Sequence, residues 1–293
     1  RRFVKTPEVM AGILTVGTIT FAGTATLEIE VDGNTPGTNH DQLNVIGGVN
    51  LSNTNLVTNG SITSSPGQMV NILSNDSTDA INGFFGGLAE GASVTINGIA
   101  FILTYQGGTE GNDVVLIEPG TWTIDGTAGG DNFDLRRSVN FIQLLIDGNV
   151  EEQRPIAAIT DIVVNGLAGN DNLDINHAGP GGQFFIDVTY NGGDDDDSLD
   201  VLGGTADEIT YTPNDGSGDH ARGTIFLDSG SVDQTIFFTG LEPTLVTTDA
   251  DVVTIDLTGA PGETATFSDD VNANDDRSQV AFGTSTLEDL TFT

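Results

Sequence analysis

A turn rich in glycine and aspartate recurs three times in the middle of this chain, and each copy leads straight into a short apolar strand. The copies are Gly126–Leu135, Gly166–Ile175 and Gly192–Val201. A turn-and-strand unit that repeats in this way is typical of a coil wound on itself, and not of a globular enzyme. The repeat therefore constrains the architecture more than it constrains the chemistry.

The first apolar residue after each turn measures the length of one repeat. These residues are Phe133, Leu173 and Leu199, so the separations are 40 and 26 residues. A spacing of about two dozen residues fits one coil of a three-faced β-helix, given strands of about five residues. The longer interval contains the polar stretch Asn149–Pro155, which we expect to be a loop pushed out of one coil.

Apolar and polar residues alternate along the rest of the chain, as in Leu27–Val31, Phe101–Tyr105 and Val253–Leu257, and this alternation predicts half-buried strands. Between the strands lie Asp-Gly and Asn-Gly pairs, which favour tight turns. We expect turns at Asp32-Gly33, Asn59-Gly60, Asn82-Gly83, Asn97-Gly98, Asp125-Gly126, Asn165-Gly166, Asn191-Gly192 and Asp215-Gly216. The sequence predicts an all-β protein built as a parallel β-helix or β-solenoid, with tandem β-sandwich domains as the alternative.

Acidic residues outnumber basic ones by 43 to 8, and the formal net charge is −35. Such a field repels phosphate backbones and anionic membrane surfaces, so we expect no nucleic acid partner. No apolar stretch is long enough to span a bilayer, so we also expect no membrane insertion. Of the 43 acids, 32 lie in residues 119–293. With the strand-breaking Pro119-Gly120, this jump in charge predicts two segments, 1–118 and 119–293.

The aspartates of the repeated turns are the best candidates for chemistry. Equivalent turns on adjacent coils would stack about 4.8 Å apart, and carboxylates that close repel unless a cation offsets them. Ca²⁺ binds six to eight oxygen atoms and suits such turns. The predicted calcium ligands are Asp131, Asp134, Asp171, Asp174, Asp194, Asp195, Asp196, Asp197 and Asp200, with a second cluster at Asp269, Asp270, Asp275 and Asp276. The alternative is that these residues favour turns and face water.

Other kinds of site have weaker support. The chain has no cysteine, and no pair among His40, His177 and His220 has the spacing of zinc ligands, so we expect exposed loop histidines. Polysaccharide-acting β-helix enzymes are a third possibility for the chain, yet catalytic motifs are absent and we expect no enzymatic activity. The paired phenylalanines at 84–85, 184–185 and 237–238 are expected to fill the core.

Residues 83–116, from Gly83-Phe-Phe-Gly-Gly to Asn112-Asp-Val-Val-Leu, resemble the end of an autotransporter-associated β-strand repeat. The likeness extends over about 11–118. Residues 120–293 resemble the Gly/Asn/Asp-rich segments of the same class of large secreted bacterial repeat proteins. The resemblance implies a right-handed parallel β-helix, secretion to the cell surface, and a structural or adhesive role.

A second likeness is to the calcium-binding nonapeptide of RTX proteins. Gly129–Phe133 and Gly169–Leu173 match the second half of that motif. Here the motifs are single and not tandem, so the family's site geometry, which forms between consecutive nonapeptides, does not carry over.

The favoured function is therefore an extracellular structural protein, a subunit or segment of a surface fibre, surface layer or matrix stabilised by Ca²⁺. A solenoid exposes unpaired strand edges at its ends, so we expect head-to-tail self-association through those edges. The alternative is a calcium-dependent adhesin module that binds a glycan or a protein partner.

Overall fold

The computed structural model describes residues 11–21, 24–213, 221–241, 244–257, 265–269, 278–282 and 290–292. Within these ranges the regular elements are β-strands, apart from one 3₁₀ turn at Ile156–Ala158. The all-β prediction is confirmed. The described part of the chain holds no helix of the length and apolar character that a membrane crossing requires.

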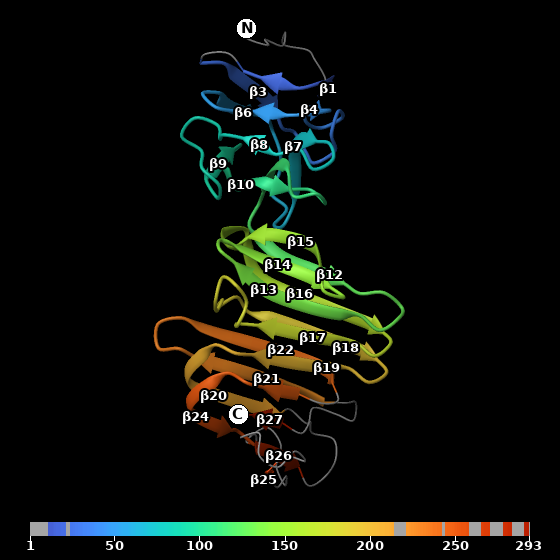
Figure 1. The fold of residues 1–293 in the computed structure, drawn as a ribbon, viewed down its shortest axis with the longest axis vertical. Helices are drawn as coiled ribbons and strands as arrows, with labels where there is room; N and C mark the ends of the chain where they lie inside the picture. Colours follow the sequence, from blue (N-terminus) through green and yellow to red (C-terminus); the bar gives the residue numbers. More distant parts are fainter. Residues whose placement is uncertain are drawn as a thin grey trace. The chain divides into compact units, whose positions relative to one another are not determined.

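Contacts divide the chain into two compact units. Unit 1 comprises Arg1–Thr121 and Glu152–Ile159, and unit 2 comprises Trp122–Glu151 and Thr160–Thr293. The chain thus leaves unit 1 close to the acidic boundary seen in the sequence, and a short segment later returns to it. Figure 1 shows the strands of both units, which are described separately below.

Unit 1 begins with three similar passes of the chain, whose strands pair in parallel with those of the next pass. The first set is β1 (Ile13–Val16), β4 (Gln42–Val45) and β7 (Met69–Asn75); the second is β2 (Ile19–Thr20), β5 (Val49–Asn50) and β8 (Ile81–Asn82); the third is β3 (Thr26–Glu30) and β6 (Asn55–Asn59). Leucines 14, 43 and 73 lie in register. Apolar residues therefore stack on themselves from pass to pass.

An antiparallel group completes unit 1. β11 (Asp113–Ile117) pairs with β7, β10 (Ile99–Gly107) pairs with β11, and β9 (Ser93–Ile96) pairs with β10. The turn between β9 and β10 is Asn97-Gly98, with φ values of 49° and 79°. This turn is confirmed, because a two-residue hairpin needs positive φ at both positions.

Unit 2 contains two stacks of strands, and in its first four passes a strand of the first stack is followed by a strand of the second. The first stack is β12 (Gly120–Asp125), β16 (Ile159–Ala168), β18 (Val188–Asp194) and β22 (Asp233–Leu241); the second is β13 (Asn132–Ser138), β17 (Asn172–Asn176), β19 (Ser198–Leu202), β23 (Thr244–Val246) and β27 (Leu290–Phe292). Phe133, Leu173 and Leu199 are direct partners across β13, β17 and β19. Their predicted equivalence is confirmed.

Antiparallel excursions interrupt these passes, so the sheets are mixed. They are β14 (Phe141–Ile146) with β15 (Asn149–Pro155), β20 (Thr205–Pro213) with β21 (Ala221–Asp228), and β25 (Ala265–Asp269) with β26 (Ser278–Phe282); β24 (Asp249–Ile255) pairs in parallel with β20. The expected loop at Asn149–Pro155 is wrong, because this segment is a strand. Asp147 and Gly148, with φ of 51° and 81°, make the tight turn that leads into it.

Two of the expected Asn-Gly turns are also wrong. Asn165-Gly166 lies inside β16 and Asn191-Gly192 inside β18. The side-chain amide of Asn191 donates to Asn165 Oδ1 at 2.8 Å, and that of Asn165 donates to Asp125 Oδ1 at 2.7 Å. Hydrogen bonds between neighbouring passes thus use side chains that would otherwise favour a turn. The Asp215-Gly216 pair lies outside the described residues.

The core of each unit is made from the inward side chains of these strands. Five of these side chains are at most 1 % exposed: Phe101 and Leu103 in unit 1, and Trp122, Phe133 and Tyr190 in unit 2. The expectation that the paired phenylalanines fill the core is wrong for two of them. Phe84 is 51 % exposed and Phe237 is 48 % exposed.

Candidate functional site: the aspartate column

Three aspartates occupy the same place in successive passes of unit 2 and form what we call the aspartate column: Asp131, Asp171 and Asp197. Each precedes a strand of the second stack, and each follows a glycine by five residues in the sequence. Their exposed fractions are 7 %, 2 % and 0 %. Carboxylates are rarely buried so completely unless they are paired, so the column needs a physical account.

The column joins one pass of the chain to the next. The backbone N–H of Asp131 donates to Asp171 Oδ1 at 2.7 Å, and the backbone N–H of Asp171 donates to Asp197 Oδ1 at 2.9 Å. At the end of the column, Asp131 Oδ2 accepts the N–H of Thr127 at 2.7 Å. Hydrogen bonds to a charged acceptor are about twice as strong as neutral ones, so the column stabilises the stacking of the passes.

Glycine precedes each aspartate because a side chain there would meet two oxygen atoms, the carbonyl oxygen of a glycine in the next pass and the second oxygen of the carboxylate. The carbonyl oxygens of Gly166, Gly192 and Gly240 would lie 2.5, 2.4 and 2.2 Å from a Cβ atom on Gly126, Gly166 and Gly192, respectively. A Cβ atom on Gly166 would lie 2.4 Å from Asp171 Oδ2, and one on Gly192 would lie 2.5 Å from Asp197 Oδ2. On Gly126 the corresponding distance to Asp131 Oδ2 would be 3.0 Å. The recurrence of glycine five residues before each aspartate is thus a steric requirement of the column.

The middle carboxylate lies in an unfavourable electrostatic environment. Burial raises the pKa of Asp171 and the charge of Asp131 raises it further, while the hydrogen bond from the Asp131 backbone opposes both. Among the described residues no group donates a hydrogen bond to Asp171 Oδ2. Burial and then the charges of Asp197 and Asp171 also raise the pKa of the fully buried Tyr190. Negative charge is therefore concentrated at this point.

A second row of aspartates lies on the other face of the same strands. Asp134, Asp174 and Asp200 are direct partners across β13, β17 and β19. Burial raises the pKa of Asp174. Burial likewise raises the pKa of Asp134, helped by the charge of Asp174, while Arg136 lowers it.

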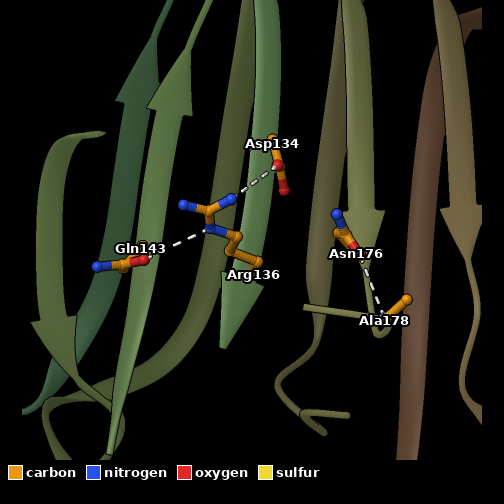
Figure 2. Close-up of polar contacts among 5 residues, drawn as sticks. All are labelled: Asp134, Arg136, Gln143, Asn176 and Ala178. Atoms are coloured by element: carbon orange, nitrogen blue, oxygen red, sulfur yellow. Dashed lines mark hydrogen bonds and ion pairs between the residues drawn. The ribbon is translucent and has the colours of Figure 1, made fainter. Parts of the chain in front are cut away.

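Arg136 is a base that lies beside this row. Figure 2 shows the Arg136 guanidinium between two partners, Asp134 Oδ2 at 3.9 Å and Gln143 Oε1 at 3.5 Å. In the same view Asn176 Oδ1 accepts the backbone N–H of Ala178 at 3.1 Å, which fixes the end of β17. The arrangement is that of a polar sheet face with one nearby cation.

Three more of the predicted ligands lie at the end of β18 and in the turn before β19. Asp194, Asp195 and Asp196 are exposed. Asp195 has a φ of 80°, and its Oδ2 accepts the N–H of Gly169 at 3.2 Å. This turn therefore also contacts the previous pass, although its carboxylates stay in water.

The structure thus brings Asp171 next to Asp197 and Asp174 next to Asp200, as the sequence predicted. Within the part of the chain that the structure describes, no three His, Asp or Glu side chains form a group that could hold a metal ion. In the second predicted cluster, Asp270, Asp275 and Asp276 lie outside the described residues, and only the backbone of Asp269 is described, at the end of β25. Calcium binding stays a prediction.

Two histidines are buried, so the expectation of exposed loop histidines is wrong for both. His40 is 0 % exposed, and its ring nitrogens lie 3.2 Å from Gly33 O and 3.0 Å from Asn71 O. His177 is 3 % exposed and its ring packs against Phe184, with centroids 5.0 Å apart. Burial lowers the pKa of His177 to about 4. His220 lies outside the described residues.

Comparisons of the chain with models of protein families, with curated proteins and with solved structures found no match. The aspartates of the column were identifiable from the three repeated turns, whereas the polar neighbourhoods of the two histidines gave no sign of their burial.

Proposed function

We propose that this chain is a structural segment of an extracellular fibre, surface layer or matrix, with its passes wound as a right-handed parallel β-helix. The observation that carries the proposal is the aspartate column. The most deeply buried carboxylates of unit 2 accept backbone N–H groups of a neighbouring pass at 2.7 and 2.9 Å. Their chemistry serves the stacking of the chain, which is what a load-resisting rod requires, and we propose no catalytic role.

The first pass of unit 1 supports assembly through strand edges. Among the residues that the structure describes, β1 is the edge strand of its sheet, and an edge strand presents unpaired backbone groups to another chain. Beneath it lies a cavity of about 280 Å³ lined mainly by apolar side chains, among them Leu27 and Leu43. Ile13 and Leu14 on β1 itself are 50 % and 47 % exposed. A strand from a second copy would pair with this edge and cover these residues.

Calcium is the expected cation of the assembled form. With a net charge of −35, copies that associate repel one another unless cations offset the charge. We propose the exposed carboxylates of Asp194, Asp195 and Asp196 as the place where calcium acts, because they are open to solvent, whereas one oxygen of each column carboxylate already accepts a backbone N–H.

Negative-stain microscopy and sedimentation of the purified chain, with calcium at about 1 mM and with chelator, test the proposal. We expect filaments or larger assemblies in calcium. Leu14→Glu should abolish them by placing a charge over the apolar cavity, whereas Val139→Glu, at a position 72 % exposed in unit 2, should not. Monomers in both conditions, at high protein concentration, would contradict the structural role.

A further inference from the structure

Two adjacent rows of side chains on the solvent face of the seven-stranded sheet of unit 2 are uncharged. The first row crosses five strands in register, from β20 through β21, β22 and β18 to β16. Each member is the direct cross-strand partner of the next, and the row consists of Thr212, Thr224, Phe237, Thr189 and Val163. With strands about 4.8 Å apart, this row is about 19 Å long.

The second row lies two residues away from the first on β20, β21 and β22, and it continues onto β24. It consists of Thr254, Thr210, Phe226 and Thr235. Their chain neighbours Ile209, Tyr211, Ile225 and Ile236 are buried, so the two rows point away from the core. All nine residues are at least partly exposed. We call the two rows together the threonine–phenylalanine face.

The absence of charge from this face is unexpected for its surroundings. The chain carries 43 acidic residues, most of them in the same unit, and acids border this face directly. Glu208, Asp228 and Asp233 are direct partners in the row next to the second row, and Asp187 Oδ1 accepts the backbone N–H of Thr235 at 2.8 Å. The two rows themselves are uncharged. Glu208 accepts hydrogen bonds from Thr254 and Thr210 at 2.6 and 3.5 Å, and Arg222 lies beyond Thr224. Exposed apolar side chains that lie together and are rimmed by polar residues mark interaction sites.

The two phenylalanines are diagonal neighbours across β21 and β22. Phe237 pairs with Thr224 and Phe226 pairs with Thr235. Diagonal positions on an antiparallel pair are about 7–8 Å apart and within reach of aromatic side chains. The face therefore has an apolar centre of two rings, with threonine hydroxyls on its flanks.

We propose that the threonine–phenylalanine face binds a neutral polysaccharide. A hydroxyl group both donates and accepts hydrogen bonds, so the threonines match the hydroxyls of a sugar, and the phenylalanine rings match the apolar C–H face of a sugar ring. The charge of the chain also favours a neutral ligand. A chain of net charge −35 repels an acidic polymer, whereas a neutral polymer is unaffected. An open face suits an extended polymer, in which many weak contacts add together.

A second copy of the chain fits this face less well. Two faces packed together would bury threonine hydroxyls without assured partners across the interface, which is unfavourable, and would bring two strongly acidic chains into contact. The polysaccharide proposal does not depend on filament assembly, because β1 and the face belong to different units.

Affinity electrophoresis in gels containing β-glucan, mannan or xylan, and sedimentation with cellulose, test the proposal, with alginate as the acidic comparison. We expect retardation by at least one neutral polymer and none by alginate. Phe237→Ala and Thr189→Asp should each weaken this binding about tenfold or more. Phe84→Ala is the matched control, because Phe84 is 51 % exposed but lies in unit 1, and it should bind as the unmodified chain does.

Thermal unfolding followed by circular dichroism establishes that the variants are folded. Failure of every neutral polymer to bind, or binding that Phe237→Ala and Thr189→Asp leave unchanged, would overturn the proposal. Dimerisation that Phe237→Ala abolishes, without binding of any neutral polymer, would assign the face to a second copy instead. Leu14→Glu should leave polysaccharide binding intact, which separates this test from that of assembly.

Discussion

Replacement of the middle carboxylate of the aspartate column should destabilise unit 2 substantially. Asp171 is 2 % exposed, and its Oδ1 accepts the backbone N–H of Asp131 at 2.7 Å. Asp171→Ala removes that acceptor and leaves a buried N–H without a partner, while its own backbone N–H can still donate to Asp197. The loss therefore concerns one contact between passes.

The magnitude follows from two opposing contributions. A hydrogen bond to a charged group is worth about 1.5–3 kcal/mol, and an orphaned buried donor costs about 1–3 kcal/mol. Against this, the raised pKa of Asp171 means that its ionised form is itself unfavourable when buried. We expect Asp171→Ala to lower the free energy of unfolding by about 2 kcal/mol, and Asp171→Asn, which keeps an acceptor without the charge, to change it by less than about 1 kcal/mol.

Urea denaturation at pH 7, followed by fluorescence of the single tryptophan, measures these changes. Trp122 is 0 % exposed and lies in unit 2, so its emission reports on the relevant unit. Because the folded state raises the pKa of Asp171, the unmodified chain should gain stability relative to Asp171→Asn as the pH falls toward 3.8. Equal losses in the alanine and asparagine variants would refute the argument, since the charge and not the acceptor would then matter.

Three further changes test other parts of the account. Gly166→Ala should cost about 1–3 kcal/mol because its Cβ would lie 2.4 Å from a carboxylate oxygen of the column, whereas Gly129→Ala, with its nearest neighbour at 4.0 Å, should be tolerated; equal effects in urea denaturation would contradict the steric requirement. The folded state lowers the pKa of His177 from 6.5 to about 4. As the pH falls from 6.5 to about 4, the free energy of unfolding of the unmodified chain should therefore decrease by about 3 kcal/mol, and His177→Gln should remove that part of the pH dependence of unfolding. Glu118→Ala should lower the free energy of unfolding by about 2 kcal/mol because it releases three hydrogen-bond donors in the turn at 64–68. Burial opposes ionisation of Glu118, but those donors hold its pKa below the usual value. The loss measured by thermal unfolding should therefore be present at pH 7 and shrink as the pH falls below 4.5.

The strand content and the stacking of the repeats could be predicted from the sequence because both depend on local patterns. Alternating apolar residues identify strands wherever one face is buried, and identical turns imply identical positions in successive passes. For this reason the partners Phe133, Leu173 and Leu199 were predicted correctly. The proximity of Asp171 to Asp197 followed from the same argument.

The errors concern residues whose role depends on a neighbouring pass. Asn165 and Asn191 have turn-forming neighbours, yet side-chain hydrogen bonds between passes hold both in strands. His177 has polar neighbours in the sequence, but Phe184, seven residues further on, packs against its ring, and the backbone N–H of His177 donates to Leu202 O of the next pass at 2.8 Å. Phe237 follows the alternation of β22 outward, while the adjacent Phe238 faces the core. A single sequence does not show which strand will lie beside which.

The carboxylates of the column accept backbone N–H groups of neighbouring passes, and we expect these contacts to form without calcium. Amide hydrogen exchange of Asp131 and Asp171, measured with calcium and with chelator, tests this claim most directly. The account predicts strong protection of both amides in either condition, and loss of protection at Asp131 in Asp171→Ala. Amides that exchange rapidly in chelator and become protected only on addition of calcium would contradict it, and would make the column a metal site.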